Sequence, residues 1–323
     1  MRKKKKTRQD YGIMKMVIAM KKIDVHTHLI GNICGIGSEG ELTPIGGGKA
    51  IYASGKVIQL IPEKYGDKSL TPETLISVLK QNDVEFSVCL QGNYAGFQNI
   101  YTYEAALKYP DMLIPAGTYD PFFRNKQLVI KHLFEDLGIK VLKMEVSNGS
   151  GLMANHSTVD LNGEVMHEVY QMAKEHQLIC FIDIGRPGNN CYQVEALSKA
   201  IRKYPEIIFI ICHLTAPQHE QMNILEENLK LLNLENVYFD IASLPNNTKQ
   251  PYPFFEAQGY IRKALDVMGI DKILWGSDFP AAMNYCSYEE AYTYIEESKI
   301  FTREEKEHIL YKNAKRLFGG LIK

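Results

Sequence analysis

Three segments between residues 139 and 185 decide the fold: "IKVLKMEV" (139–146), "NGEVMHEVYQMAKEHQ" (162–177) and "LICFIDIG" (178–185). The first and third segments are short apolar runs, which predict buried strands, while the middle segment has apolar residues at helical spacing. A strand, a helix of this length and a second strand predict a right-handed crossover between parallel strands. The unit therefore predicts an α/β fold.

The same alternation continues in both directions along the chain. Further strand-like runs lie at 21–28, 84–91, 112–120, 207–214, 236–243 and 272–280, with helical patterns between them. Eight parallel strands with crossover helices match a closed (β/α)8 TIM barrel. A doubly wound open sheet is the rival, but no GxGxxG or GxxxxGK[ST] phosphate loop follows any strand.

We expect one barrel domain over 20–323, because no break in composition divides the 323 residues. The segment 30–70 is rich in glycine and turn formers, and we predict a long, lid-like loop after the first strand. Residues 1–19 begin "MRKKKKTRQD" and are predicted to be a disordered basic extension. Their apolar stretch is interrupted by Lys15 and is too short to span a membrane.

Composition narrows the class of partner. Lys+Arg 37 against Asp+Glu 38 gives a formal net charge of −1, which argues against nucleic acid or an anionic membrane as a partner. Six cysteines without framework spacing predict reduced thiols and a cytoplasmic protein. A small molecule is the expected partner, and self-association to a homo-oligomer is left open.

Polar residues stand where the predicted strands end, which is where barrel enzymes place their sites. Strict alternation along the first strand would put Asp24, His26 and His28 on one face. The later strands offer Lys143, Glu145, Asp183, His213, Asp240 and Asp278. Imidazole and carboxylate groups suit zinc, manganese or iron, so this set predicts a divalent metal site.

Four motifs, "DVHTHL", "CHL", "ILWGSDFP" and "ILYKNAKRLFG", together resemble the amidohydrolase superfamily, specifically its amidohydrolase-2 branch of metal-dependent TIM-barrel hydrolases and decarboxylases. The resemblance runs from about Lys21 to Phe318. It implies that His26 and His28 bind the metal, and that Asp278 is both a ligand and the catalytic proton acceptor. His213 matches a histidine that polarises or protonates the substrate.

The sequence departs from the family at the fifth strand. Members of the branch typically carry a metal-binding histidine there, whereas this chain reads "FIDIG" and offers Asp183. Either Asp183 replaces imidazole as an oxygen ligand, or metal binds weakly and the chain acts without it, as some lactone-hydrolysing relatives do. A carboxylate buried without a cation is costly, which favours Asp183 as a ligand. Glu145 is a further candidate ligand, with ion pairing between strands as its alternative.

The predicted function is metal-dependent hydrolysis of a lactone, amide or related carbonyl, with zinc as the first choice of metal and manganese as the second. Nonoxidative decarboxylation of an aromatic or enol carboxylate is the alternative reaction, and a catalytically inactive, ligand-binding barrel is the alternative class. Arg186, Arg124 and Lys143 are candidate substrate-binding residues. Asp24 is expected to hold the metal ligands in position without binding the metal itself.

Overall fold

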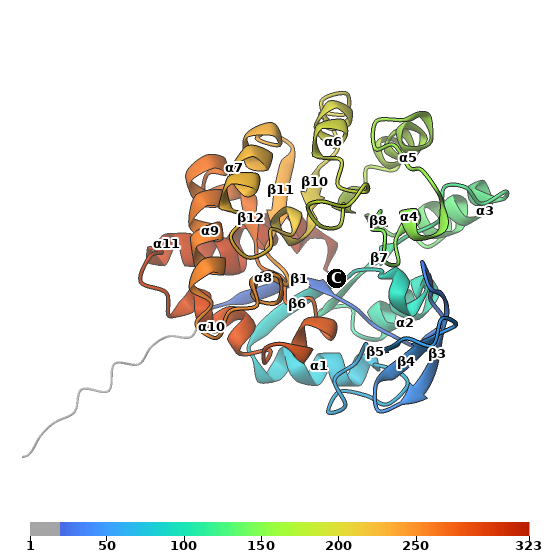
Figure 1. The fold of residues 1–323 in the computed structure, drawn as a ribbon, viewed down its shortest axis with the longest axis horizontal. Helices are drawn as coiled ribbons and strands as arrows, with labels where there is room; N and C mark the ends of the chain where they lie inside the picture. Colours follow the sequence, from blue (N-terminus) through green and yellow to red (C-terminus); the bar gives the residue numbers. More distant parts are fainter. Residues whose placement is uncertain (1–19, 323) are drawn as a thin grey trace, which may run out of the picture.

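Eight parallel strands form the barrel in the computed structural model, which describes residues 20–322 (Figure 1). Their order in the sheet follows the chain, as predicted: β1 (Lys22–Thr27), β6 (Val84–Cys89), β7 (Leu113–Gly117), β8 (Val141–Glu145), β9 (Ile179–Asp183), β10 (Phe209–Ile211), β11 (Val237–Asp240) and β12 (Ile273–Leu274). The first and last strands meet at a parallel bridge between Thr27 and Phe279. The His28 amide donates to the Phe279 carbonyl at 2.8 Å, which closes the barrel at the end that carries the polar residues. The predicted extension 1–19 lies outside the described residues.

Helices connect successive strands and surround the barrel (Figure 1). They are α1 (Pro72–Gln81), α2 (Asn99–Lys108), α3 (Lys126–Ile130), α4 (Leu152–Asn155), α5 (Glu164–Glu175), α6 (Val194–Ile201), α7 (Met222–Leu231), α8 (Leu244–Thr248), α9 (Phe255–Met268), α10 (Glu290–Glu296), α11 (Arg303–Glu307) and α12 (Asn313–Phe318). Helix α1 begins as its sequence predicts, since Thr71 accepts the Thr74 amide at 3.3 Å and Pro72 occupies the first turn.

The apolar core has two parts. One lies between the strands and the surrounding helices, and the other gathers strand residues such as Val25, Phe86 and Val141 with α12. Phe318 of α12 stacks on Phe181 of β9 with ring centroids 6.0 Å apart. Because Phe181 and Asp183 lie on the same strand, this packing holds in place the strand that carries Asp183.

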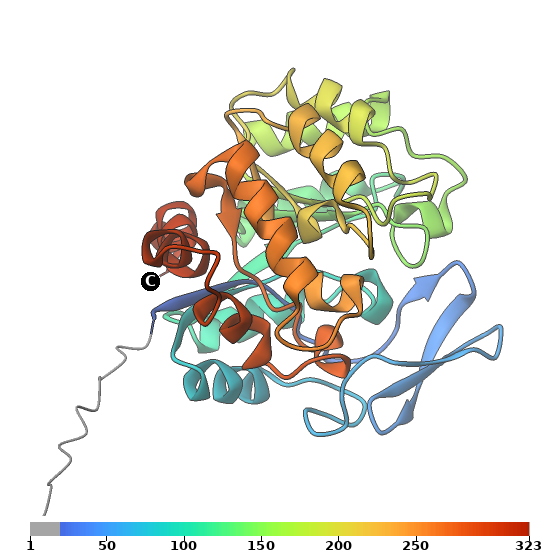
Figure 2. The same ribbon diagram turned by 60° about the vertical axis from the view of Figure 1, so that its left-hand side comes forward.

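The segment after the first strand is long, as predicted, but much of it is a small antiparallel sheet of β2 (Ile36–Gly37), β3 (Gly40–Gly46), β4 (Lys49–Tyr52) and β5 (Val57–Gln59). Figure 2 shows this sheet beside the barrel. The glycines that suggested a loop form the tight turn between β3 and β4. Gly48 has φ +71°, and a Cβ there would lie 1.8 Å from the Ile61 oxygen.

All six cysteines lie in the described part of the chain, and none of them forms a disulfide. Five are buried, as the packed thiols predicted from the sequence would be. Within residues 20–322, no helix has the length and apolar character needed to cross a bilayer.

Candidate active site

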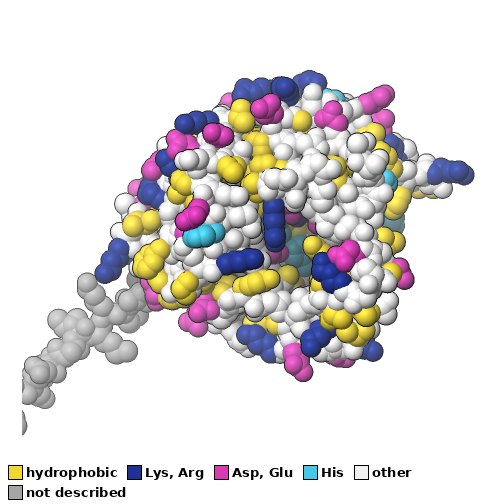
Figure 3. All heavy atoms as spheres, in the orientation of Figure 1, with side chains coloured by type: hydrophobic (Ala, Val, Ile, Leu, Met, Phe, Trp, Pro, Cys, Tyr) yellow, Lys and Arg dark blue, Asp and Glu magenta, His cyan; other side chains and the backbone are white. Residues whose placement is uncertain are grey.

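Two adjoining cavities open at the carboxyl ends of the strands. The smaller one, of about 160 Å³, is lined on one side by Leu29, Ile30, Leu60, Ala95 and Pro280, and we call it the apolar lobe. The larger one, of about 390 Å³, is lined by Asn148, Arg186, Asn189, Ser243, Asn246 and Asn247, and we call it the polar lobe. Both share Tyr94, Glu145, Asp183, His213 and Asp278. Figure 3 shows a hollow near the centre of this face, with Lys or Arg side chains at its rim and histidine within it.

Three predicted ligands come together at the junction of the two lobes. The potential ligand atoms of His26, His28 and Asp278 all lie within 4.8 Å of one another. Asp278 Oδ1 is 3.2 Å from His28 Nε2 and 3.7 Å from His26 Nε2. Strand β1 supplies His26, His28 follows directly after it, and the segment after β12 supplies the aspartate, so closure of the barrel creates the cluster.

Both imidazoles are held so that Nε2 faces Asp278. His28 Nδ1 lies 3.1 Å from the Leu90 carbonyl oxygen, which can only accept, so Nδ1 carries the proton. His26 Nδ1 lies 3.0 Å from Asp240 Oδ2 and is likewise the donor. Burial lowers the pKa of His26 to about 4, although the Asp240 carboxylate opposes this shift. His26 is therefore a neutral imidazole with a lone pair on Nε2.

This arrangement fits a divalent cation. Burial by itself would raise the pKa of Asp278, but hydrogen bonding with His28 and the charges of nearby histidines hold it well below its usual range. With a proton on Nδ1 only, each imidazole would present an Nε2 lone pair to the carboxylate, and groups that can only accept need a proton or a metal ion between them. Two imidazole nitrogens and a carboxylate are a ligand set suited to zinc.

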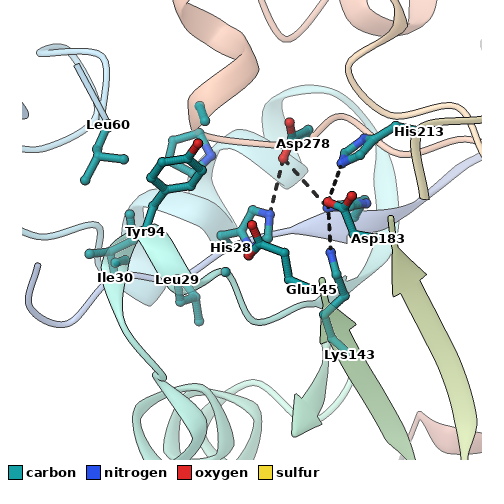
Figure 4. A pocket seen from close by; sticks show the side chains of 15 residues that line it. His28, Leu29, Ile30, Leu60, Tyr94, Lys143, Glu145, Asp183, His213 and Asp278 are labelled. Carbon is teal, nitrogen blue, oxygen red and sulfur yellow. Dashed lines mark hydrogen bonds and ion pairs between the residues drawn. The ribbon is translucent and has the colours of Figure 1, made fainter. Parts of the chain in front are cut away.

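The structure places Asp183 beside Lys143 and His213 (Figure 4). Asp183 Oδ2 is 3.4 Å from His213 Nε2 and 3.9 Å from Lys143 Nζ, while Oδ1 accepts the Gly185 amide at 2.9 Å. Burial alone would raise the pKa of Asp183, but His213 and Lys143 hold it well below its usual range. Asp183 is therefore ionised with two cationic partners, and its role as a metal ligand stays a prediction.

His213 is poised as a cation. Its Nδ1 donates to the Ala242 carbonyl at 3.0 Å, which directs Nε2 into the cavity. Burial would lower the pKa of His213, but the Asp183 carboxylate, followed by Asp278 and Asp240, raises it to about 9. The ring lies 4.8 Å from that of His26, centroid to centroid. A protonated imidazole thus stands next to the three candidate ligands.

Lys143 and Glu145 line the cavity from β8. Lys143 is 2% exposed; burial disfavours its ammonium, but the surrounding acidic groups raise its pKa. Glu145 Oε1 accepts the hydroxyls of Ser147 and Ser150, each at 2.8 Å, and Oε2 accepts the Asn93 amide at 3.0 Å. These three donors occupy the Glu145 carboxylate and place it as a support of the cavity wall.

The expectation that Asp24, His26 and His28 share one face is wrong. The register between β1 and β6 shifts on both sides of Asp24, so side chains do not alternate regularly along β1. The Asp24 carboxylate accepts the amides of His26 and Ser277 at 3.1 and 2.9 Å and the Tyr288 hydroxyl at 2.7 Å. It does not line either lobe, yet it joins the backbones that carry His26 and Asp278.

The two predicted arginines are placed differently. Arg186 lines the polar lobe, whereas Arg124 is exposed and lines neither lobe. Two further polar residues hold the predicted ligands in place: Asp240, which was predicted only as one of the polar residues of the strands, and Ser243, which was not predicted. Asp240 orients His26, and the Ser243 hydroxyl donates to Asp278 Oδ2. The position of Ser243 shortly after β11 could have indicated a role, because all the strands end at the same mouth of the barrel.

Three residues of the site share a left-handed backbone. His213, Ser243 and Asp278 each have φ of 58° at the ends of β10, β11 and β12. This conformation costs about 1–2 kcal/mol for a residue other than glycine, and such strain concentrates at functional sites. The strained backbone positions therefore coincide with the cluster of polar side chains at the carboxyl ends of the strands.

The chain belongs to the amidohydrolase family, whose family model matches residues 23–320. The resemblance inferred from the sequence motifs is thereby confirmed, and the protein is an enzyme of the amidohydrolase superfamily. No curated protein matches this chain significantly.

Solved structures with the same fold are distant in sequence. A "probable 2-pyrone-4,6-dicarboxylic acid hydrolase" from Acinetobacter baumannii with citric acid bound has a TM-score of 0.70 at 18% identity, covering 93% of this chain and 100% of the other. An amidohydrolase from Burkholderia multivorans with bound zinc has a TM-score of 0.68 at 13% identity, covering 92% and 99%. A 2,6-dihydroxybenzoate decarboxylase from Rhizobium has a TM-score of 0.54 at 12% identity, covering 76% and 88%. These likenesses establish the barrel, and the family is one of hydrolases and decarboxylases.

Proposed function

We propose that this enzyme is a divalent-metal-dependent hydrolase acting on a lactone, an amide or a related carbonyl of a small molecule that carries a carboxylate. The observation that carries the proposal is that Nε2 of His26 and Nε2 of His28 both face the Asp278 carboxylate, at 3.7 and 3.2 Å. These three residues would hold the cation, with zinc as the first choice and manganese as the second. Asp183 is the candidate fourth ligand.

A bound divalent cation would supply two effects, lowering the pKa of water toward neutrality and polarising the substrate carbonyl. The chain's own groups supply the proton transfers. Asp278 accepts the proton of the attacking water and passes it to the leaving group, while the Ser243 hydroxyl fixes its other oxygen. His213, whose pKa is raised to about 9, is protonated at neutral pH and stabilises the negative charge that develops on the carbonyl oxygen.

Metal content and activity test this proposal together. Wild-type protein and the His28→Ala variant are analysed for bound transition metals, and both are assayed against lactones, amides and carboxylic acids. We expect wild-type protein to bind stoichiometric metal and His28→Ala to lose metal and hydrolysis together. His219→Ala is the matched control, because His219 is exposed and pairs with Glu256 away from both lobes.

The outcomes separate the alternatives. If His28→Ala retains both metal and activity, the proposal is wrong. Release of CO2 from carboxylic acids, without hydrolysis of any carbonyl compound, identifies the decarboxylase alternative. A wild-type protein that takes up no metal after reconstitution and turns over nothing identifies an inactive ligand-binding barrel.

A further inference from the structure

We propose that the polar lobe is a carboxylate-binding subsite, in which the Arg186 guanidinium and the Asn247 amide hold an anionic group of the substrate remote from the reacting carbonyl. The inference rests on the proposed function, because it takes the reacting carbonyl to lie beside His26, His28 and Asp278. The substrate class is thus a compact dicarboxylate or oxocarboxylate whose carbon skeleton joins the two lobes.

Arg186 supplies the charge. It follows β9 on the segment that begins after Asp183, and it is exposed at the wall of the polar lobe. Within residues 20–322, no ion pair or side-chain hydrogen bond involves its guanidinium. The acidic groups shared by both lobes already have partners of their own. Asp183 has His213 and Lys143, and Glu145 has three hydrogen-bond donors. Asp278 has His28 and Ser243. Arg186 is therefore a cation in the cavity wall that lacks an internal anion.

Asn247 supplies the second, independent observation. It is 7% exposed and lines the same lobe from α8. Its Nδ2 is buried without a hydrogen-bond acceptor among the described residues. A buried donor without an acceptor is unfavourable, and an acceptor brought by a ligand removes that cost. The nitrogen is closed to solvent in this structure. Rotation of the amide about its broad terminal torsion would present the NH2 group to a ligand in the polar lobe.

A carboxylate fits these two groups better than a neutral ligand does. The planar guanidinium fork matches the two oxygens of a carboxylate, and an amide NH2 adds one more donor to either of them. Lys or Arg side chains at the rim of the hollow favour the approach of an anion (Figure 3). The apolar lobe, with Ile30, Leu60 and Pro280, is suited to the uncharged carbon skeleton.

Binding of two aromatic acids tests the inference. Isophthalate carries two carboxylates and benzoate carries one, and both are titrated calorimetrically into zinc-loaded protein. We expect wild-type protein to bind isophthalate about tenfold more tightly than benzoate, since a charge-assisted contact contributes at least that much. Asn247→Asp, which keeps the shape but removes the donor, should abolish the preference. Arg186→Gln should also abolish the preference for isophthalate. Because Arg186 is exposed, this substitution does not disturb a buried part of the fold.

Asn233→Asp is the control for the added charge. Asn233 is exposed and donates to the Val267 carbonyl in the loop that precedes β11, at the opposite end of the barrel. This variant should keep the preference for isophthalate. The inference is overturned if wild-type protein shows no preference, or if both Arg186→Gln and Asn247→Asp keep it.

The same titrations in metal-free protein separate this inference from the proposed function. In metal-free protein, any loss of isophthalate affinity in Arg186→Gln and Asn247→Asp comes from the polar lobe and not from the metal site. A protein that takes up no zinc, and yet loses isophthalate affinity in both variants, would contradict the proposed function and support the subsite.

Discussion

Asp240 offers the sharpest test of how the site is built, because it controls which nitrogen of His26 carries the proton. We expect Asp240→Asn to weaken zinc binding by about 10- to 100-fold, as is typical when a carboxylate behind a metal-binding histidine is lost. That change corresponds to about 1.4–2.7 kcal/mol of binding free energy. The fold should remain intact.

The structure explains why a change of one atom has this effect. Asp240 Oδ1 accepts the amides of His213 and Ala242 at 2.9 and 3.1 Å, and an asparagine oxygen can keep both hydrogen bonds. The asparagine NH2 would then occupy the position of Oδ2, 3.0 Å from His26 Nδ1. Two donors cannot share that contact, so the imidazole proton moves to Nε2, the nitrogen needed for the metal.

The zinc dissociation constant is measured by competition with a chromophoric chelator, and circular dichroism reports the fold. Asp266→Asn is the control, since Asp266 is 56% exposed and pairs with Arg262 on the surface of α9. An Asp240→Asn protein that is folded and binds zinc with wild-type affinity would refute the reasoning.

Four further outcomes are expected. Asp183→Asn should lower the pKa of His213, which the carboxylate raises to about 9, so the activity lost as pH rises through that value should be lost at lower pH in the variant. If Asp183 is a metal ligand instead, the Asp183→Asn variant will also lose bound metal. Gly276→Ala should reduce both metal content and the melting temperature, because the new Cβ would lie 2.6 Å from His26 Cβ. Lys143→Met should destabilise the fold by about 3–5 kcal/mol in denaturant titrations, because it leaves buried carboxylates without their cation. Removing zinc with a chelator should lower the melting temperature, by an amount equivalent to about 2.7 kcal/mol for protein first held at 100 times the dissociation constant.

The barrel and the centre of the site could be predicted from the sequence because both depend on patterns within single strands. Apolar runs separated by helical patterns define the order of the strands, and that order brings strand ends to one mouth. His28 and Asp278 are 250 residues apart in the chain, but His28 follows β1 directly and Asp278 lies a short segment after β12, so closure of the barrel brings them together.

Other contacts depend on geometry that no single segment contains. His26 and Asp240 lie on strands that are not neighbours in the sheet, so their contact follows from the curvature of the barrel. The direction of Asp24 follows from register shifts in β1, which alternation along a strand cannot reveal. The sheet β2–β5 was missed because its turns are so rich in glycine that they masked the short strands.

The joining of β1 to β12 has a consequence for synthesis of the protein. Asp24 links the amides of His26 and Ser277, and the His28 amide bonds to Phe279, so the histidines and their aspartate form one unit only after the last strand is in place. A nascent chain that has emerged from the ribosome only as far as β11 carries both histidines but lacks Asp278. Under the proposed function, metal capture by this cluster would therefore be a late event in biogenesis, and a tightly bound ion would indicate that the last strand has been made and the barrel has closed.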